Sequence, residues 1–218
     1  SCTYTHTSAT LESFRYAATF ERSCNISFWL SKFPKWKLSR GTELNGATAL
    51  HCAVYFGQNK LNSVRALIEA GADPFVRNDG GASVLMNAVS NDDSDPVVVK
   101  YLLRVLGGKQ KMLPKLRSEI LYRRSAQTMK WKGISFVSTV LTRYKLSKSA
   151  LLNYLAFDAG VTVLDYAVKR GDVEIVEILL KHGANPYSLS KLGMNAFGVC
   201  EKHGPFESVE LCLQKYSS

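Results

Sequence analysis

Apolar residues recur at helical spacing in four similar short segments of the chain. Each segment opens with a valine and has apolar side chains three and four positions after it. This spacing predicts amphipathic helices, each with one stripe to bury. No apolar run reaches the roughly 18 residues that span a bilayer, so no membrane-spanning helix is expected. The four segments begin at Val64, Val99, Val176 and Val209.

A second motif precedes these segments. Residues 46–53 and 160–167 both read G-x-T-x-L-[HD]-x-A, and weaker copies begin at Gly81 and Gly193. The start glycines are 35 residues apart in the first pair of copies and 33 in the second. A fixed period of this length predicts stacked helix pairs, because one pair cannot bury its own apolar face.

The residue types at the ends of each motif fit helix boundaries. Thr162, with Asp165 three positions later, has the pattern of a capping box. Gly71 and Gly183 stand where the second helix of a pair must end, and glycine readily adopts the left-handed conformation that such an end requires. Each is followed by Ala-[DN]-Pro, and the proline prevents the helix from restarting.

These residues resemble the ankyrin repeat, whose 33-residue pattern contains G-x-T-P-L-H-x-A-A. The resemblance implies an all-α solenoid of stacked antiparallel helix pairs with finger loops, and a capping role for His51. Ala49, Val84, Val163 and Ala196 replace the family's proline. We expect a single domain over residues 1–218, with repeat units at about 10–42, 43–77, 78–112, 113–156, 157–189 and 190–218.

The fourth unit breaks the period and forms one enlarged, degenerate repeat. Residues 116–127 and 134–144 both read as helices, and we expect them to pack as a pair. Their apolar stripe would consist of Leu116, Ile120, Leu121, Phe136, Val137, Val140 and Leu141.

The same region carries the chain's entire net charge of +10. Residues 107–150 hold eleven basic residues and one acid, Glu119. Unpaired charges are costly to bury, so Arg123, Arg124, Lys130 and Lys132 are expected to project into solvent. The patch either binds an anionic partner (nucleic acid, anionic lipid or an acidic peptide, possibly of the calmodulin kind) or is an ordinary solvated surface. It consists of Lys109, Lys111, Lys115, Arg117, Arg123, Arg124, Lys130, Lys132, Arg143, Lys145 and Lys148.

The ankyrin resemblance implies partner contacts at the ends of the first helices and on the fingers. We therefore expect a protein-interaction or regulatory scaffold module that acts as a monomer. Phe20 and Phe56 either contact a partner or pack between repeats, and Trp36 is either an anchor or a lid on the terminal repeat. The positions carried over are Phe20, Trp36, Leu44, Asn45, Tyr55, Phe56, Asp79, Asn91, Asp158, Lys169, Arg170, Lys191, Lys202 and His203.

Other kinds of chemistry lack a motif. The five cysteines are scattered without a CxxC pair, which favours reduced thiols and an intracellular, cytoplasmic setting. Cys200 and His203 have ligand-like spacing but no second pair of ligands. No catalytic motif is present, so we expect no enzymatic activity, cofactor, metal or small-molecule substrate. The chain starts without Met or a secretory signal pattern, which suggests a piece of a longer protein.

Overall fold

The computed structural model of the chain describes Phe14, Ala18 and residues 23–43, 45–56, 60–91, 93–107, 113–144, 146, 149, 158–204 and 206–216. Every regular element in these residues is an α-helix, and the β-structure among them is an isolated bridge between Arg77 and Ser83. The chain divides into two compact units. Unit 1 is Ser1–Asp79 with Ser83–Val105, and unit 2 is Gly80–Ala82 with Leu106–Ser218.

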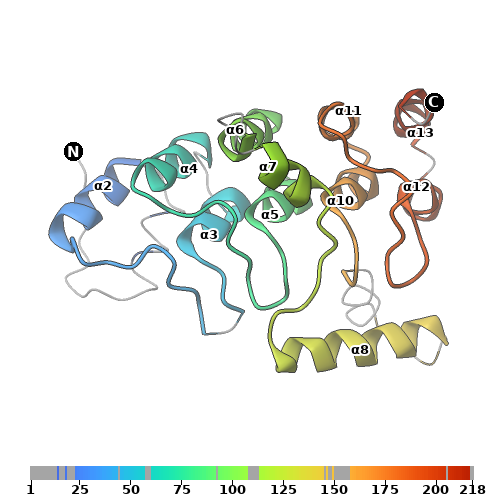
Figure 1. Cartoon of the computed structure of the whole chain (residues 1–218), viewed down its shortest axis with the longest axis horizontal. Helices are drawn as coiled ribbons and strands as arrows, with labels where there is room; N and C mark the ends of the chain where they lie inside the picture. Colours follow the sequence, from blue (N-terminus) through green and yellow to red (C-terminus); the bar gives the residue numbers. More distant parts are fainter. Residues whose placement is uncertain are drawn as a thin grey trace. The chain divides into compact units, whose positions relative to one another are not determined.

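Unit 1 is built from stacked helices. Helix α3 pairs with α4, and the two rows continue as α3 packs against α5 and α2 against α4 (Figure 1). The helices, with α6 ending in unit 2, are α2 (Ser23–Lys32), α3 (Ala49–Phe56), α4 (Lys60–Glu69), α5 (Val84–Ser90) and α6 (Pro96–Gly107).

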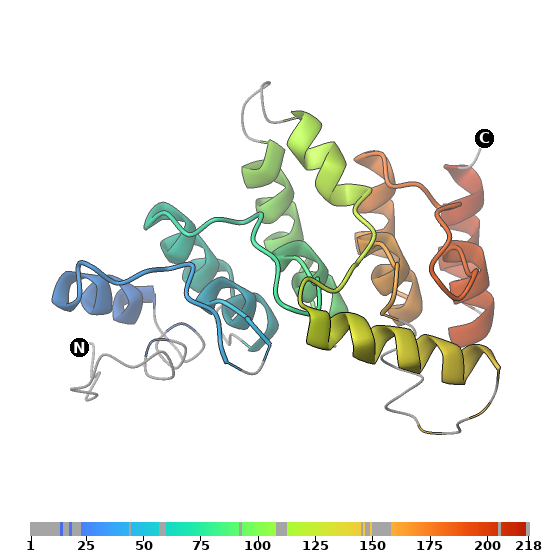
Figure 2. The ribbon, with the colours of Figure 1, turned by 60° about the horizontal axis from the view of Figure 1, so that its bottom comes forward.

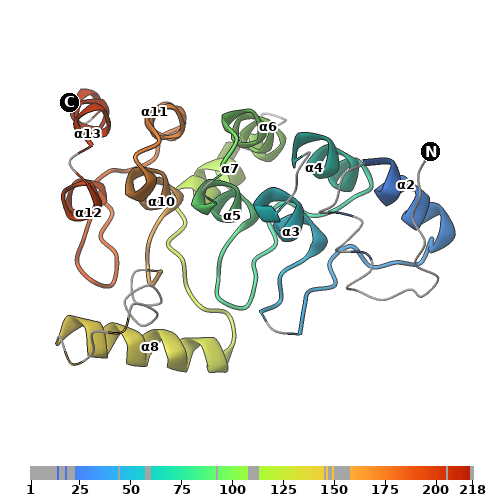
Figure 3. The same ribbon diagram turned by 180° about the vertical axis from the view of Figure 1, so that it is seen from behind.

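Unit 2 repeats this arrangement in two regular pairs, α10 with α11 and α12 with α13. The inner helices α10 and α12 pack against each other, as do the outer helices α11 and α13 (Figure 3). The helices are α7 (Leu113–Ile120), α8 (Met129–Arg143), α10 (Val163–Arg170), α11 (Val173–Lys181), α12 (Ala196–His203) and α13 (Glu207–Lys215). The predicted all-α repeat fold is confirmed.

The apolar stripe of the second helices forms the core in both units. Val64 and Leu67 of α4 are fully buried, and Val176 and Leu179 of α11 are equally inaccessible. Burying such a side chain contributes about 1.5–3 kcal/mol relative to exposure. The valine-based segments therefore stabilise each unit in the way that the spacing predicts.

Side chains at the predicted boundaries cap the helices. The Thr162 amide and hydroxyl donate to the Asp165 carboxylate over 2.6 and 2.9 Å, which completes the capping box of α10. His51 is buried in the corresponding position of α3, with Nδ1 2.9 Å from the Thr48 hydroxyl. Gly71 and Gly183 have φ angles of 96° and 86° after α4 and α11. The predicted capping roles are confirmed.

The middle segment differs from the predicted helix pair. Helix α7 ends at Ile120, and the chain runs without helix until Thr128 caps α8. The helix stops because Arg124 pairs with the next finger: its amide donates to Val161 over 2.8 Å and its carbonyl accepts from Gly160 over 2.9 Å. The boundaries predicted at 116–127 and 134–144 are wrong, although both helices exist.

Helices α7 and α8 do not pack as a pair. Helix α8 runs across the ends of the finger loops of unit 2, away from α7 (Figures 1 and 2). Leu116 and Ile120 of α7 are buried as expected, but Phe136 and Val137 of α8 are exposed. The predicted common apolar stripe is therefore wrong, because α8 turns a different face toward the fingers.

Candidate partner-binding surfaces

An aromatic pair stands at the end of the inner helix α3 in unit 1. Tyr55 is half-buried, while Phe56 is 63% exposed, and their ring centroids lie 4.7 Å apart at 71°. The Asn91 side-chain amide donates to the Tyr55 carbonyl and holds the end of the helix. Phe56 is therefore largely accessible at the surface rather than buried between repeats. Phe20 lies outside the described residues.

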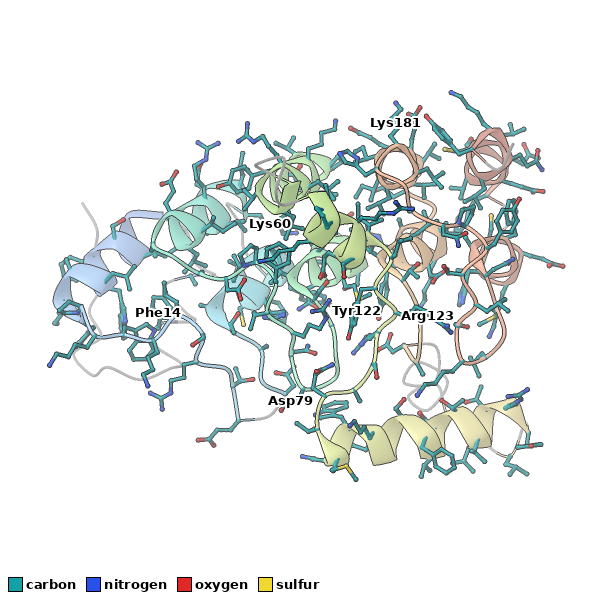
Figure 4. All side chains as sticks on the ribbon, in the orientation of Figure 1. Phe14, Lys60, Asp79, Tyr122, Arg123 and Lys181 are labelled. Carbon is teal, nitrogen blue, oxygen red and sulfur yellow. The ribbon has the colours of Figure 1, made fainter. Side chains whose placement is uncertain are left out.

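The fingers of unit 1 are fixed by their own hydrogen bonds. The Asn45 side-chain oxygen accepts from the Thr42 hydroxyl over 2.7 Å, and the Asn45 carbonyl accepts from the Asp79 amide over 2.8 Å. Asp79 lies at the lower tip of the next loop (Figure 4). Both residues are half-buried and partly accessible, whereas Leu44 lies outside the described residues.

Trp36 packs onto the terminal helix of unit 1. Its ring lies 5.2 Å from Phe14 and 5.4 Å from Trp29, with the Arg40 guanidinium 5.7 Å away on the ring face. Phe33 extends the cluster, with its ring centroid 4.7 Å from that of Trp29. Of the two interpretations of Trp36, these contacts support a lid over the repeat.

The corresponding helix ends of unit 2 are basic. Lys169 and Arg170 are half-buried at the end of α10, and Lys202 and His203 are exposed at the end of α12. Partial burial lowers the pKa of His203, and the positive charges of Lys169 and Lys202 lower it further. His203 is therefore neutral at physiological pH, and the lysines and the arginine supply the positive charge of this surface.

The fingers of unit 2 differ in accessibility. Lys191 is exposed, and its amide donates to the Ala159 carbonyl over 2.9 Å. Asp158 is buried and accepts from the Tyr166 hydroxyl over 2.7 Å. The assignment of Asp158 to the partner surface is corrected accordingly, because its carboxylate points inward.

Arg124 is the internal partner of that carboxylate. It forms a 2.6 Å ion pair with Asp158 and donates to the Gly80 carbonyl over 3.0 Å and to the Tyr166 hydroxyl. Burial raises the pKa of Tyr166 far above its usual range, and Asp158 adds to this while Arg124 opposes it. The prediction that Arg124 projects into solvent is wrong, because the finger supplies a buried acid that the local sequence does not reveal.

The other described cations of the basic segment are exposed. Arg123 is exposed and donates to the carbonyls of Gly160 and Leu189, so it is tethered to two fingers (Figure 4). Lys109, Lys111, Lys145 and Lys148 lie outside the described residues. The other exposed cations are Lys115, Arg117, Lys130, Lys132 and Arg143.

Among the described residues, no group of three or more His, Cys, Asp or Glu side chains could hold a metal ion. The buried Cys200 thiol lies 3.8 Å from the Phe206 carbonyl, and burial raises its pKa. No helix among the described residues is long and apolar enough to cross a membrane.

Comparison with known proteins identifies the repeat. The family model of ankyrin repeats (3 copies) matches residues 14–112, and that of the single ankyrin repeat matches residues 159–191. The chain belongs to the ankyrin-repeat family. Ankyrin repeats are in general protein–protein interaction modules and are typically not enzymes. The stretch between the two matches contains α7, the Arg124 segment and α8.

Two ankyrin-repeat relatives each match 69 residues of the chain. Ankyrin repeat protein L92 of Acanthamoeba polyphaga mimivirus is 42% identical over 32% of this chain and 16% of its own length. The ankyrin repeat and KH domain-containing protein mask-1 of Caenorhabditis elegans is 32% identical over 32% of this chain and 3% of its own length. The similarity thus covers a small part of each relative.

Proposed function

We propose that the chain is a non-enzymatic interaction module that binds a protein partner through the inner-helix ends and fingers of its repeats. The observation that supports this most is the Tyr55–Phe56 pair, which presents an exposed aromatic ring on a hydrogen-bonded helix end. Aromatic side chains on rigid elements are frequent hot spots, because they bury a large area at low entropic cost.

The second unit suggests the chemistry of the partner. Lys191 and Lys202 are exposed there, so we propose that the partner meets them with acidic or carbonyl groups. Such charges at an interface rim mainly raise the association rate and lose their effect in high salt.

The test replaces Tyr55 and Phe56 with alanine in the 218-residue chain. A partner is first isolated with the wild-type chain, and its affinity for both forms is then measured by calorimetry. We expect the variant to bind the partner at least about tenfold more weakly than the wild type. Its free energy of unfolding should change by less than about 1 kcal/mol. The matched control is Leu211→Ala on α13, an exposed apolar residue on an outer helix, which should leave the affinity unchanged.

Two outcomes contradict this site. An unchanged affinity would show that the aromatic pair does not contact the partner. A loss of stability of about 3–5 kcal/mol, as for a truncated core aromatic, would show that the pair is part of the core.

The basic segment supports a second candidate, an anionic partner such as nucleic acid, anionic lipid or an acidic peptide. Arg124 forms an internal ion pair with Asp158, but five cations of α7 and α8 are exposed, as is the hydrogen-bonded Arg123. Nucleic-acid binding through them would weaken steeply with salt, about in proportion to the number of phosphates contacted.

We also propose that the chain acts as an intracellular monomer without a small-molecule substrate. Cys52 and Cys200 are buried and not joined in a disulfide, which suits a reducing compartment. Analytical ultracentrifugation across a range of concentrations tests the monomer, since a concentration-dependent mass would exclude it.

A further inference from the structure

Helix α8 turns a side with both apolar and polar residues toward the fingers. Ser138 is completely buried, and its hydroxyl donates to the Ser135 carbonyl over 3.1 Å. Trp131, Ile134 and Ser135 line a small cavity together with the Arg124–Asp158 pair. The Thr128 side chain caps the first turn. These contacts determine which side of the helix faces away from the fingers.

The outward face of α8 is apolar. Met129, Phe136, Val137 and Tyr144 are 81%, 69%, 51% and 67% exposed, and they follow one another at helical spacing along the same side. A helix on the surface of a globular unit normally has its apolar residues on the buried side and polar residues on the outer side. The exposed stripe therefore calls for a binding partner.

Cations border this stripe on both sides. Lys130 lies on one edge, with Lys132 and Arg143 on the other, and all three are exposed. The sequence of α8 contains no acidic residue. An apolar centre with basic edges complements a surface that is apolar inside and anionic at its boundary, which is the profile of a bilayer with acidic headgroups.

The shape of the outward face of α8 favours an anionic lipid surface over nucleic acid or an acidic peptide. The apolar residues stand on the convex side of a helix about 22 Å long, and a fluid headgroup layer can close around such a ridge without a preformed groove. A nucleic acid would require cations in the centre of the contact, where α8 has Phe136 and Val137. The helix has 15 residues and cannot span a bilayer, so it would lie in the membrane plane.

We propose that α8 is an interfacial helix that docks the chain on an anionic lipid surface, with Phe136 and Val137 inserted and Lys130, Lys132 and Arg143 at the phosphates. This inference rests on the second candidate function and specifies its ligand. The inner-helix ends and fingers proposed for the protein partner are separate residues.

The test is co-sedimentation of the 218-residue chain with vesicles at about 0.15 M salt. One set is phosphatidylcholine with about 30% phosphatidylserine, and the other is phosphatidylcholine alone. We expect wild-type binding to the first set and at least about tenfold weaker binding to the second.

Variants separate the two parts of the face. Phe136→Ser with Val137→Ser should weaken binding about tenfold or more, since insertion loses its apolar area. Lys130→Gln, Lys132→Gln and Arg143→Gln together should weaken it about a hundredfold, at roughly fivefold per cation. The matched control, Leu211→Ser with Lys35→Gln, removes an exposed apolar residue and an exposed cation outside α8 and should bind like the wild type.

Each other outcome overturns the proposal in a distinguishable way. If the Phe136 and Val137 substitutions leave vesicle binding unchanged, the chain adheres by charge alone and α8 does not insert. Binding to poly-glutamate or duplex DNA but not to vesicles would refute the lipid surface and leave the second candidate standing. Failure with every anion would refute both, whereas the protein-partner proposal would be unaffected. Circular dichroism of each variant verifies its fold.

Discussion

Helices α11 and α8 belong to the same unit, but only α8 has a stripe of exposed apolar residues. Helix α11 buries Val176 and Leu179 in the core and turns Glu174 and Lys181 to solvent. Helix α8 buries Ser138 and exposes Phe136. The first arrangement stabilises the repeat, whereas the second cannot, because an exposed ring gains little from folding. Burial in the repeat core therefore does not explain the apolar residues on the outward side of α8, which is the basis of the proposed lipid contact.

The largest expected difference lies in stability. Leu179→Ala should reduce the free energy of unfolding by about 2–5 kcal/mol, because it leaves a cavity in the core. Phe136→Ala should change it by less than about 1 kcal/mol, although it removes a larger side chain. Urea unfolding followed by circular dichroism measures both. Equal losses would show that Phe136 is packed and would remove the contrast.

A second comparison is between two cations of the basic segment. Arg124→Gln should cost about 3 kcal/mol, because it leaves the buried Asp158 carboxylate without its ion-pair partner. Lys132→Gln, at an exposed position of α8, should reduce the free energy of unfolding by less than about 0.5 kcal/mol. Thermal unfolding of the two variants measures this difference in stability. Similar melting temperatures would mean that the internal ion pair contributes nothing.

Acid dependence sharpens the contrast at the start of α10. Burial raises the pKa of Asp165 to about 6, against the lowering effects of Thr162 and Arg123. Between about pH 4 and 6 the folded chain thus holds a proton that the unfolded chain has lost, and stability from this group decreases as pH rises. The wild type should therefore lose about 2 kcal/mol relative to Asp165→Asn across this window. Parallel pH profiles of the two chains would exclude the raised pKa.

The smallest effect concerns the cap of α8. Thr128 accepts from the Trp131 amide over 3.4 Å, so Thr128→Ala should destabilise the helix by about 0.5–1 kcal/mol. Hydrogen exchange should show faster exchange in α8 alone, since the repeat core does not depend on this cap. Acceleration spreading into α10 and α12 would show instead that α8 supports the repeats.

The sequence predicted the features that depend on local spacing. The buried valines and leucines, the Thr162–Asp165 capping box and the glycine ends of α4 and α11 follow from residue types three to four positions apart. Tyr55 and Phe56 could be placed at a helix end by the same pattern, although only the structure shows that Phe56 is exposed.

The features that the sequence did not predict depend on distant residues. Arg124 is paired with Asp158, and nothing near Arg124 in the chain marks it as internal. Helix α8 has apolar residues on more than one face, so its pattern could not tell whether Trp131 or Phe136 would point inward. The side of α8 that faces inward depends on the finger residues Asp158 and Ala159, which line the cavity together with Trp131.

The most direct test of the account measures which side of α8 is accessible. Phe136→Cys and Ser138→Cys are labelled separately with a maleimide, and peptide mass spectrometry distinguishes the new thiol from the five native cysteines. We predict rapid labelling at position 136, slow labelling at 138, and protection of position 136 when phosphatidylserine vesicles are added. Faster labelling at 138, or no protection of 136 by vesicles, would contradict an outward lipid-binding face.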